Sequence, residues 1–143
     1  MIDHAAVIAR LTGCGLFRKV GGAVEGAAAI DGKTPLPDGG ISAFVIPMTD
    51  TPEAPISYDP VVQTVASSFG VLCALKRAGD ATGAGALDPL KTLSDGLAGV
   101  LVGWTVPGTL LPLILGPARL MDLQPGIVWW LAEFETKSCG ADL

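Results

Sequence analysis

Histidine is almost absent from this chain, which has one, His4, among its 143 residues. Catalysis by a serine or cysteine nucleophile with a histidine base would have to use that residue. The nearest cysteine along the sequence, Cys14, lies beyond the end of the helix that we expect to carry His4, and the chain has no Gly-x-Ser-x-Gly motif. His4 is therefore predicted to face solvent, and the sequence predicts no catalytic residue and no enzyme.

Charged side chains are also scarce, at 16% of the residues against roughly 25% in an average globular chain. Since so few charges must cover the surface, part of that surface is expected to be buried against other chains. The alternative is an excess of alanine and glycine, which raises the mean hydropathy to +0.53 without forming patches. The net charge of −5 argues against a protein that binds the nucleic-acid backbone, because such a protein needs a basic face.

Cysteine is limited to Cys14, Cys73 and Cys139, which are far apart and odd in number. They form neither a zinc-ligand spacing nor a disulfide framework, so we expect free thiols in a reducing compartment and no metal or other cofactor. The N-terminal segment lacks the cationic region of a signal peptide. Gly32-Lys33-Thr34 is not a phosphate-binding loop, because Ala27 replaces the required glycine and two prolines follow where a helix should begin.

The longest uncharged run extends from Gly96 to Ala118 and is long enough to cross a bilayer, which takes about 20 mostly apolar residues. Pro107-Gly108 at its middle is a strong turn signal. A turn in hydrocarbon would leave backbone groups unpaired, and neither end carries a basic cluster or an aromatic belt. We therefore predict the end of a helix, a turn and a strand, with no membrane span.

The pattern of apolar residues predicts an α+β fold, in which a mixed or antiparallel sheet of four to five strands carries two to three helices, in one domain of residues 1–143. Asp3 is expected to cap a first helix, Asp88 the last, and Gly103 to end the last in the left-handed conformation. The expected helices end near Thr12, Ile30 and Val102. The expected strands are Leu16–Val20, Ile41–Met48, Val61–Arg77 with a bend near Ser67, Ser68 or Gly70, Leu110–Leu115 with Ala118–Leu123 around Gly116-Pro117, and Ile127–Thr136.

Two groups of acids and the three tryptophans are the candidate site residues. Glu133 and Glu135 share one face of the last strand and are read as a solvated strand end rather than an acid–base pair. The segment Thr49–Pro60, which contains three acids, is predicted to be a long exposed loop. Trp104 is expected in the core, whereas Trp129 and Trp130 point to opposite faces, so that one is core and the other is core or a subunit contact.

Taken together, several segments resemble the tail terminator (tail completion) proteins of long-tailed phages and related prophages. The most specific are the Gly-Trp at the end of the last helix and the tryptophan-rich last strand. The segments that carry the resemblance are Ala9-Arg10-Leu11, Ile41–Pro47, Val62-Gln63, Lys76-Arg77, Leu87–Val102, Gly103-Trp104, Val128-Trp129-Trp130 and Phe134.

This resemblance implies a structural virion protein of the tail, assembled in the bacterial cytoplasm. It implies a ring, expected to be a hexamer, that caps the head-proximal end of the tail tube, ends tube polymerisation and joins the tail to a head–tail connector (stopper) protein. We expect Gln63, Trp130 and Phe134 at the contact between subunits. Asp50, Glu53 and Asp59 are expected to line the pore, where negative charge would keep passing DNA from sticking. Another head–tail connector or tail-tube assembly protein, a small membrane protein and an enzyme with an unrecognised site are the alternatives left open.

Overall fold

The computed structural model describes residues 2–33, 36, 40–76, 87–124 and 126–139, without the side chains of 87–90, 122–124 and 139. These residues form a mixed five-stranded sheet in the order β1-β2-β5-β7-β6, with β1 parallel to β2 and the other neighbours antiparallel. The predicted α+β class is confirmed. The elements are α1 His4–Gly13, β1 Lys19–Gly21, α2 Ala23–Ile30, β2 Ile41–Pro52, β3 Ser57–Tyr58, β4 Val61–Val62, β5 Thr64–Lys76, α3 Leu87–Leu101, β6 Ile114–Gln124 and β7 Ile127–Cys139.

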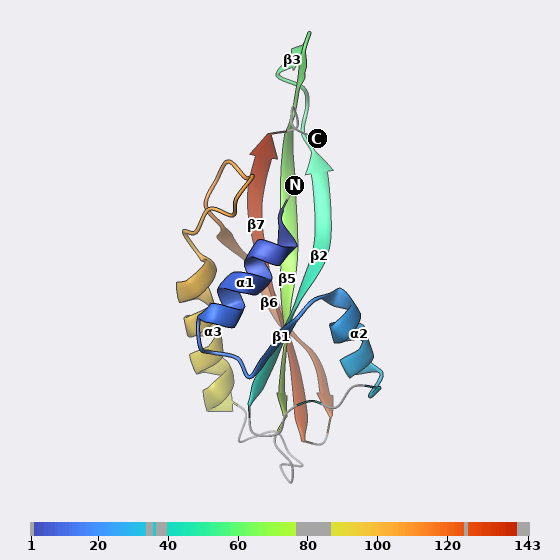
Figure 1. The fold of residues 1–143 in the computed structure, drawn as a ribbon, viewed down its shortest axis with the longest axis vertical. Helices are drawn as coiled ribbons and strands as arrows, with labels where there is room; N and C mark the ends of the chain where they lie inside the picture. Colours follow the sequence, from blue (N-terminus) through green and yellow to red (C-terminus); the bar gives the residue numbers. More distant parts are fainter. Residues whose placement is uncertain (1, 34–35, 37–39, 77–86, 125, 140–143) are drawn as a thin grey trace.

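Helices α1 and α3 pack on one face of the sheet, which we call the helix-covered face (Figure 1). Apolar side chains at helical spacing, such as Val7 with Leu11 and Leu97 with Leu101, are fully buried against the sheet. Beneath them the rings of Phe69 and Phe134 stack with their centroids 5.6 Å apart. This face therefore holds the main core of the subunit.

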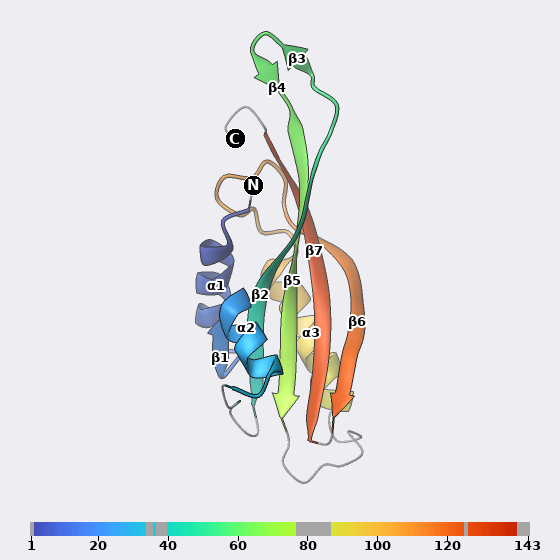
Figure 2. The same ribbon diagram turned by 90° about the vertical axis from the view of Figure 1, so that its right-hand side faces the viewer.

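The opposite face, which we call the open face, carries one helix, α2, placed over β1 and β2 (Figure 2). Phe44 packs beneath α2, where a Cβ on Gly26 would lie 3.1 Å from the Cβ of Phe44. Trp129 and Leu131 continue this smaller core toward β7. Trp130 packs on the helix-covered face, so the prediction that the two adjacent tryptophans point to opposite faces is confirmed.

The signals at Asp3, Gly103 and Pro107-Gly108 for helix ends and a turn are confirmed. The carboxylate of Asp3 accepts hydrogen bonds from the backbone N–H groups of Ala5 and Ala6, at 3.1 and 3.3 Å. Gly103 has φ +85° just after α3, and Gly108 has φ +89° in the turn that the Thr109 N–H closes on the Val106 carbonyl. In the described part of the chain no helix is long and apolar enough to span a membrane.

Two features of the predicted strands differ in the structure. β2 continues past Pro47 to Pro52, so the expected loop from Thr49 is wrong over its first part. The strand continues because β5 pairs with it along its whole length. Pro47, which lacks an N–H, is tolerated because the pairing is irregular between Pro47 and Thr49, where the register shifts by a bulge. The strand expected from Val61 is divided at Gln63 into β4 and β5, and the register of β5 with β7 continues unbroken from Thr64 to Lys76.

Other boundaries shift by less. β6 begins at Ile114 rather than Leu110, and it is interrupted between Leu115 and Ala118, at the predicted Gly-Pro break. α3 includes Asp88 in its first turn rather than having it as the preceding cap. The loop expected over residues 78–86 and the strand end at residue 77 lie outside the described residues.

Candidate functional site

A hairpin extends beyond the end of the sheet, and we call residues 53–63 the arm (Figures 1 and 2). Its strands β3 and β4 pair with each other, and the Ile56 N–H donates to the Val62 carbonyl at 2.8 Å. At its base the Glu53 N–H donates to the Thr64 carbonyl, and the side-chain amide of Gln63 donates back to the Glu53 carbonyl, each at 2.8 Å. These bonds hold the arm in line with β2 and β5.

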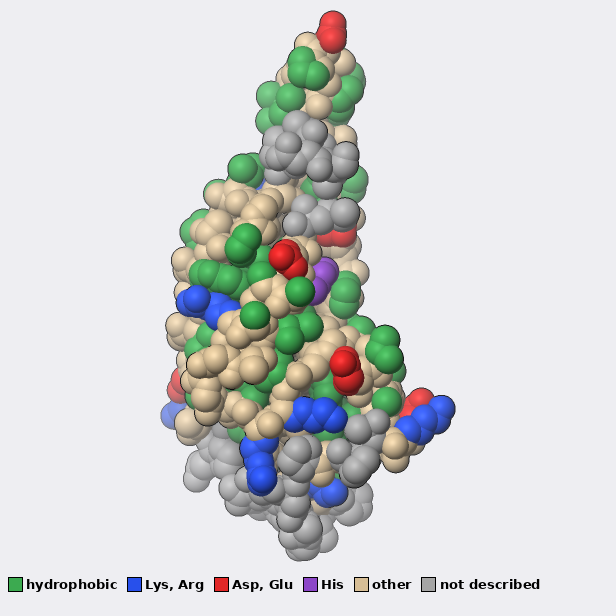
Figure 3. Space-filling model, viewed as in Figure 1, with side chains coloured by type: hydrophobic (Ala, Val, Ile, Leu, Met, Phe, Trp, Pro, Cys, Tyr) green, Lys and Arg blue, Asp and Glu red, His purple; other side chains and the backbone are tan. Residues whose placement is uncertain are grey.

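The tip of the arm is apolar. Ile56, Tyr58 and Val61 are 77%, 78% and 55% exposed, and hydrophobic side chains surround the tip with an acidic one at its end (Figure 3). Three large apolar side chains gathered so far from any core are unusual on a monomer's surface, where such residues are normally scattered. The tip therefore has the composition of a contact surface.

The part of the open face beside α2 contains a hollow of about 380 Å³, which we call the apolar groove. Two of its lining side chains pack over Gly70, where a Cβ would lie 2.7 Å from a methyl group of Leu131 and 3.5 Å from the sulfur of Met48. The groove is lined by Ile30, Ile46, Met48, Leu72, Arg119, Met121, Trp129 and Leu131. Methionine adapts its shape to what it packs against, so this lining suits an apolar protein side chain.

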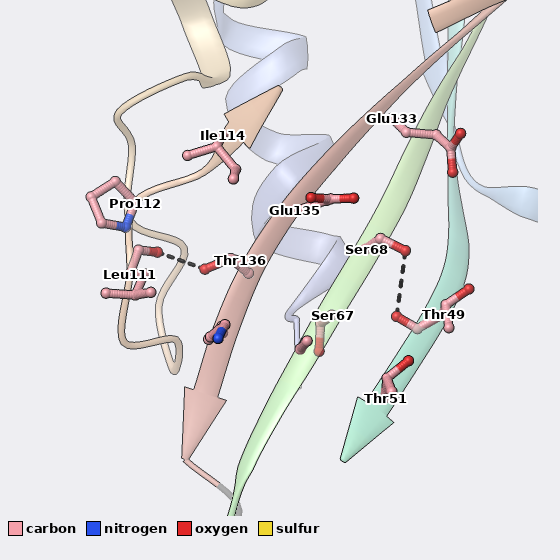
Figure 4. A pocket seen from close by; sticks show the side chains of 12 residues that line it. Thr49, Thr51, Ser67, Ser68, Leu111, Pro112, Ile114, Glu133, Glu135 and Thr136 are labelled. Atoms are coloured by element: carbon pink, nitrogen blue, oxygen red, sulfur yellow. Dashed lines mark hydrogen bonds between the residues drawn. The ribbon is translucent and has the colours of Figure 1, made fainter. Parts of the chain in front are cut away.

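Toward the arm the same face becomes polar, around a second hollow of about 440 Å³, the polar groove (Figure 4). Thr49 and Thr51 come from β2, and the Ser68 hydroxyl donates to the Thr49 carbonyl at 3.5 Å. On its other side the Thr136 hydroxyl donates to the carbonyl of Leu111 at 2.6 Å. Glu133, Glu135 and Lys137 also line this hollow, so it has the composition of a polar contact surface.

Glu133 and Glu135 both line the polar groove, which confirms that they share one face. Glu133 forms an ion pair with Arg119, with 3.2 Å between Nη1 and Oε2, at the boundary between the two grooves. Glu135 is exposed. In the described residues no group of three or more histidine, cysteine or acidic side chains could hold a metal ion. The pair thus separates an apolar half of the open face from a polar half.

The three residues expected at a subunit contact lie in three different places. Gln63 braces the base of the arm, as described above. Trp130 is half-buried against the helix-covered face, and its indole N–H has no acceptor among the described residues. Phe134 is 1% exposed, so its ring belongs to the subunit's own core.

The three acids expected to line a pore are not gathered in one loop. Asp50 lies on β2 opposite Ser67, and Asp59 lies in the turn at the tip of the arm. Glu53 forms an ion pair with Lys137, at 2.6 Å between Oε1 and Nζ, which ties the base of the arm to β7. The pair is about half exposed, so it adds at most a modest contribution to stability.

His4 does not face solvent as predicted. Its ring meets the edge of Phe69 at a centroid distance of 6.4 Å, and its buried Nε2 has no partner among the described residues. Cys14 lies at the other end of α1, about 15 Å along the helix, with its thiol donating to the Leu11 carbonyl. The structure therefore gives no histidine–cysteine dyad in this helix.

Sequence reasoning missed the contact residues of the arm and of the apolar groove. Ile56 and Tyr58 alternate with smaller residues, which is a strand signal, but Pro52, Pro55 and Pro60 around them indicated a loop. Met48 and Met121 come from strands far apart in the sequence. Only the pairing of those strands through β5 and β7 brings them to one face.

Comparison with known proteins gives one family. The chain matches the family described as "Phage tail terminator protein" over residues 1–140. No curated protein matches it. The match covers nearly the whole chain, including the arm, both grooves and the helix end at Gly103-Trp104. The chain therefore belongs to the phage tail terminator protein family, and its role is a structural one in the assembly of the phage tail.

Proposed function

We propose that copies of this chain close into a ring, of six subunits, on the head-proximal end of the phage tail tube. The ring ends tube polymerisation and offers its free side to a head–tail connector protein. Family membership supports the structural role in the tail. The ring itself rests on the surface of the single chain, which leaves large apolar areas uncovered.

The observation that carries this proposal is the exposed apolar surface at both ends of the open face. The tip of the arm is one area, and the apolar groove with the neighbouring edge of β6 is the other. In β6 the side chains of Ile114 and Met121, which line the two grooves, are about half exposed, at 56% and 49%. Contiguous apolar surface of this kind marks contacts between proteins, and contacts in permanent assemblies resemble a core cut in half.

The edge strand β6 favours a closed assembly, because it is poorly suited to pair with a strand of another chain and so to extend the sheet without limit. β6 is an edge strand, but its register shifts between Leu115 and Ala118 and again between Leu120 and Asp122. Pro117 also lacks an N–H at the first of these irregularities. Bulges and proline are the usual means by which an edge strand is kept from pairing with another chain. Subunits are thus expected to meet through side-chain surfaces.

Within the ring we propose that Asp50 and Glu53 face the channel through which DNA passes, whereas Asp59, at the tip of the arm, is assigned to a contact between subunits. The net charge of the chain is −5, so a ring of six carries about −30, and the phosphate backbone would be repelled rather than bound. The tube protein and the connector protein are the proposed partners above and below the ring.

Light scattering and negative-stain microscopy of the purified protein test the proposal. We expect particles with the mass of six subunits and rings of uniform diameter. Added to polymerising tube protein, the rings should arrest elongation and sit at one end of each tube. A protein that stays monomeric, or that spreads along the tube wall, would contradict the proposal. Binding to heads but not to tubes would instead indicate another connector component.

A further inference from the structure

We propose that the arm of one subunit seats its apolar tip in the apolar groove of the next copy. The occupant of the groove is therefore Tyr58, flanked by Ile56 and Val61, from a second copy of this chain. This inference deepens the proposed ring and rests on it, because it names the contact by which one subunit holds its neighbour.

The tip presents the right chemistry for such a contact. Tyr58 is 78% exposed and, once seated, an aromatic side chain buries on the order of 150–250 Å². Tyrosine is also enriched where contacts between proteins are strongest, because a large ring buries much area with few rotatable bonds. The β3–β4 pairing and the bonds at the base of the arm order the tip before binding. Little conformational freedom is then lost when it docks.

The groove presents the complementary chemistry. It holds about 380 Å³, and Met48 and Met121 at its rim are 39% and 49% exposed. Trp129 and Leu131 form a buried apolar floor. A hollow of this size is in the range that receives a ring and a neighbouring aliphatic side chain.

The arm of a subunit does not reach that subunit's own groove. From Ile46, at the groove, to Pro52, at the start of the arm, β2 runs in one direction for roughly 20 Å. The arm then continues away from the groove, as both views of the ribbon show. A tip held in line with β2 and β5 can fill only the groove of another molecule.

Charge favours the same pairing. Asp59 follows Tyr58 at the end of the tip, and Arg119 lies at the rim of the groove with its side chain 52% exposed. Glu133 takes one of the five N–H donors of the guanidinium, through Nη1. The seated tip would bring Asp59 to this cation, and opposite charges at a rim guide orientation and association.

The contact joins two different surfaces of the same chain, so it is head-to-tail. Repeated around a rotation axis, such a contact closes into a ring, and every subunit both gives and receives one arm. A reciprocal exchange between two subunits would instead close at the dimer.

Paired cysteines test the contact. In a Cys14→Ser, Cys139→Ser background we would place Tyr58→Cys with Met121→Cys and treat the assembled protein with a short bismaleimide. Cys73 remains, but it is 1% exposed and burial raises its thiol pKa to about 12, so it stays protonated and unreactive. The expected result is a ladder of covalent species up to the full ring. The matched control pairs Tyr58→Cys with Asp95→Cys, an exposed position on α3, and should give no ladder.

Each outcome decides the proposal. Rings whose Tyr58→Cys/Met121→Cys subunits crosslink no more than the Asp95 control would overturn the arm contact and leave the ring standing. Crosslinking that stops at the dimer would overturn the head-to-tail arrangement. Crosslinking of Tyr58→Cys to the tube protein in capped tubes, without Met121→Cys, would assign the tip to a different occupant. Protein that is monomeric throughout would overturn the proposed function together with the contact.

Complementary disruption gives a second measurement. Tyr58→Asp should disable the tip and Met121→Asp the groove, and each protein alone should be monomeric but folded, with the far-ultraviolet circular dichroism spectrum of the parent. Mixed in equal amounts, the two retain one intact tip and one intact groove, so they should form one-to-one dimers and no rings. Failure of the mixture to dimerise would contradict the contact, as would rings formed by either variant alone.

Discussion

At the scale of single residues, aromatic side chains of the helix-covered face fix how the subunit packs. Phe69 and Phe134 face each other from neighbouring strands at the register position that pairs them, and both are fully buried. His4 adds its ring edge against Phe69. These contacts tie α1 to the centre of the sheet, so the stability of the subunit depends on them whether or not it assembles.

Replacing Phe134 by alanine is expected to reduce the free energy of unfolding by about 3–5 kcal/mol, because a large buried ring is lost and the stacked Phe69 faces a cavity. Urea unfolding followed by tryptophan fluorescence measures the change. Leu115→Ala, on an exposed side chain of β6, is the control and should change stability little. Equal losses in the two variants would show that Phe134 is not a core residue.

The carboxylate of Glu25 makes the free energy of unfolding depend on pH. Its Oε2 accepts a hydrogen bond from the Gly22 N–H at 2.7 Å, which lowers the pKa of this fully exposed side chain below its ordinary 4.5. Folding therefore favours the ionised form. The stabilisation is present above the unfolded-state pKa and is lost as the pH falls through the lower folded-state pKa.

Glu25→Gln is expected to be less stable than the parent at pH 7, and this difference should shrink as the pH is lowered from 5 to 3. Denaturant unfolding of both proteins at several pH values measures it. A difference that stays constant down to pH 3 would show that the ionised carboxylate contributes nothing beyond its shape. Lys33→Gln, an exposed change beyond the end of α2, controls for the loss of one charge.

At the scale of elements, the end of α3 shows how a single glycine determines where a helix stops and where the chain goes next. Gly103 takes a positive φ, after which the Trp104 N–H bonds the Leu101 carbonyl and the indole ring lies 4.6 Å from the guanidinium carbon of Arg10. The Arg10 Nε also donates to the Val100 carbonyl at 2.8 Å. The helix end thus docks on α1 through one cation–π contact and one hydrogen bond.

Alanine substitutions at two glycines of this region are expected to change the free energy of unfolding in opposite directions. Gly103→Ala should destabilise by about 1–2 kcal/mol, since the space around it is open but the left-handed backbone is strained for any side chain. Gly99→Ala, inside α3 with equally open surroundings, should stabilise by up to about 1 kcal/mol through helix propensity. Thermal unfolding of both variants measures the effects. Changes of the same sign would contradict the assignment of the helix end.

The elements also show which parts of the fold can be read from sequence. The cap at Asp3, the helix end at Gly103 and the turn at Pro107-Gly108 follow from neighbouring residues, so they were predictable. The extension of β2 beyond Pro47 depends on hydrogen bonds from β5, which lies further along the chain, and local signals indicated a loop there. The burial of His4 likewise depends on Phe69. The apolar groove could not be predicted, because its lining comes from α2 and four strands.

At the scale of the whole molecule, the helix-covered face of the sheet holds the main core of the subunit, whereas the open face leaves apolar side chains exposed in the single chain. An apolar tip projects from one end (Figures 2 and 3), and the apolar groove lies on the open face, away from that tip. This separation of two complementary surfaces suits a head-to-tail assembly. The few charges of the sequence are consistent with the same account, because much of this surface would be buried between subunits.

The proposed pore can be tested through its acids. Glu53 is paired with Lys137 and Asp59 is assigned to the contact between subunits, so Asp50→Asn is the more selective change. The variant should form rings but deliver DNA less efficiently, with fewer infective particles per assembled tail, because less negative charge would repel the passing phosphates. Asp95→Asn, on α3, is the matched control. Unchanged infectivity with normal rings would place Asp50 away from the channel.

The central claim is that this chain forms one closed ring at the end of the tail tube, and cryo-electron microscopy of particles containing the protein tests it most directly. The account predicts density for a single ring of six copies of this fold at the head-proximal end of the tube, with each arm reaching the open face of the adjacent copy. Copies distributed along the tube, placed at its distal end, or present as unconnected monomers would contradict it.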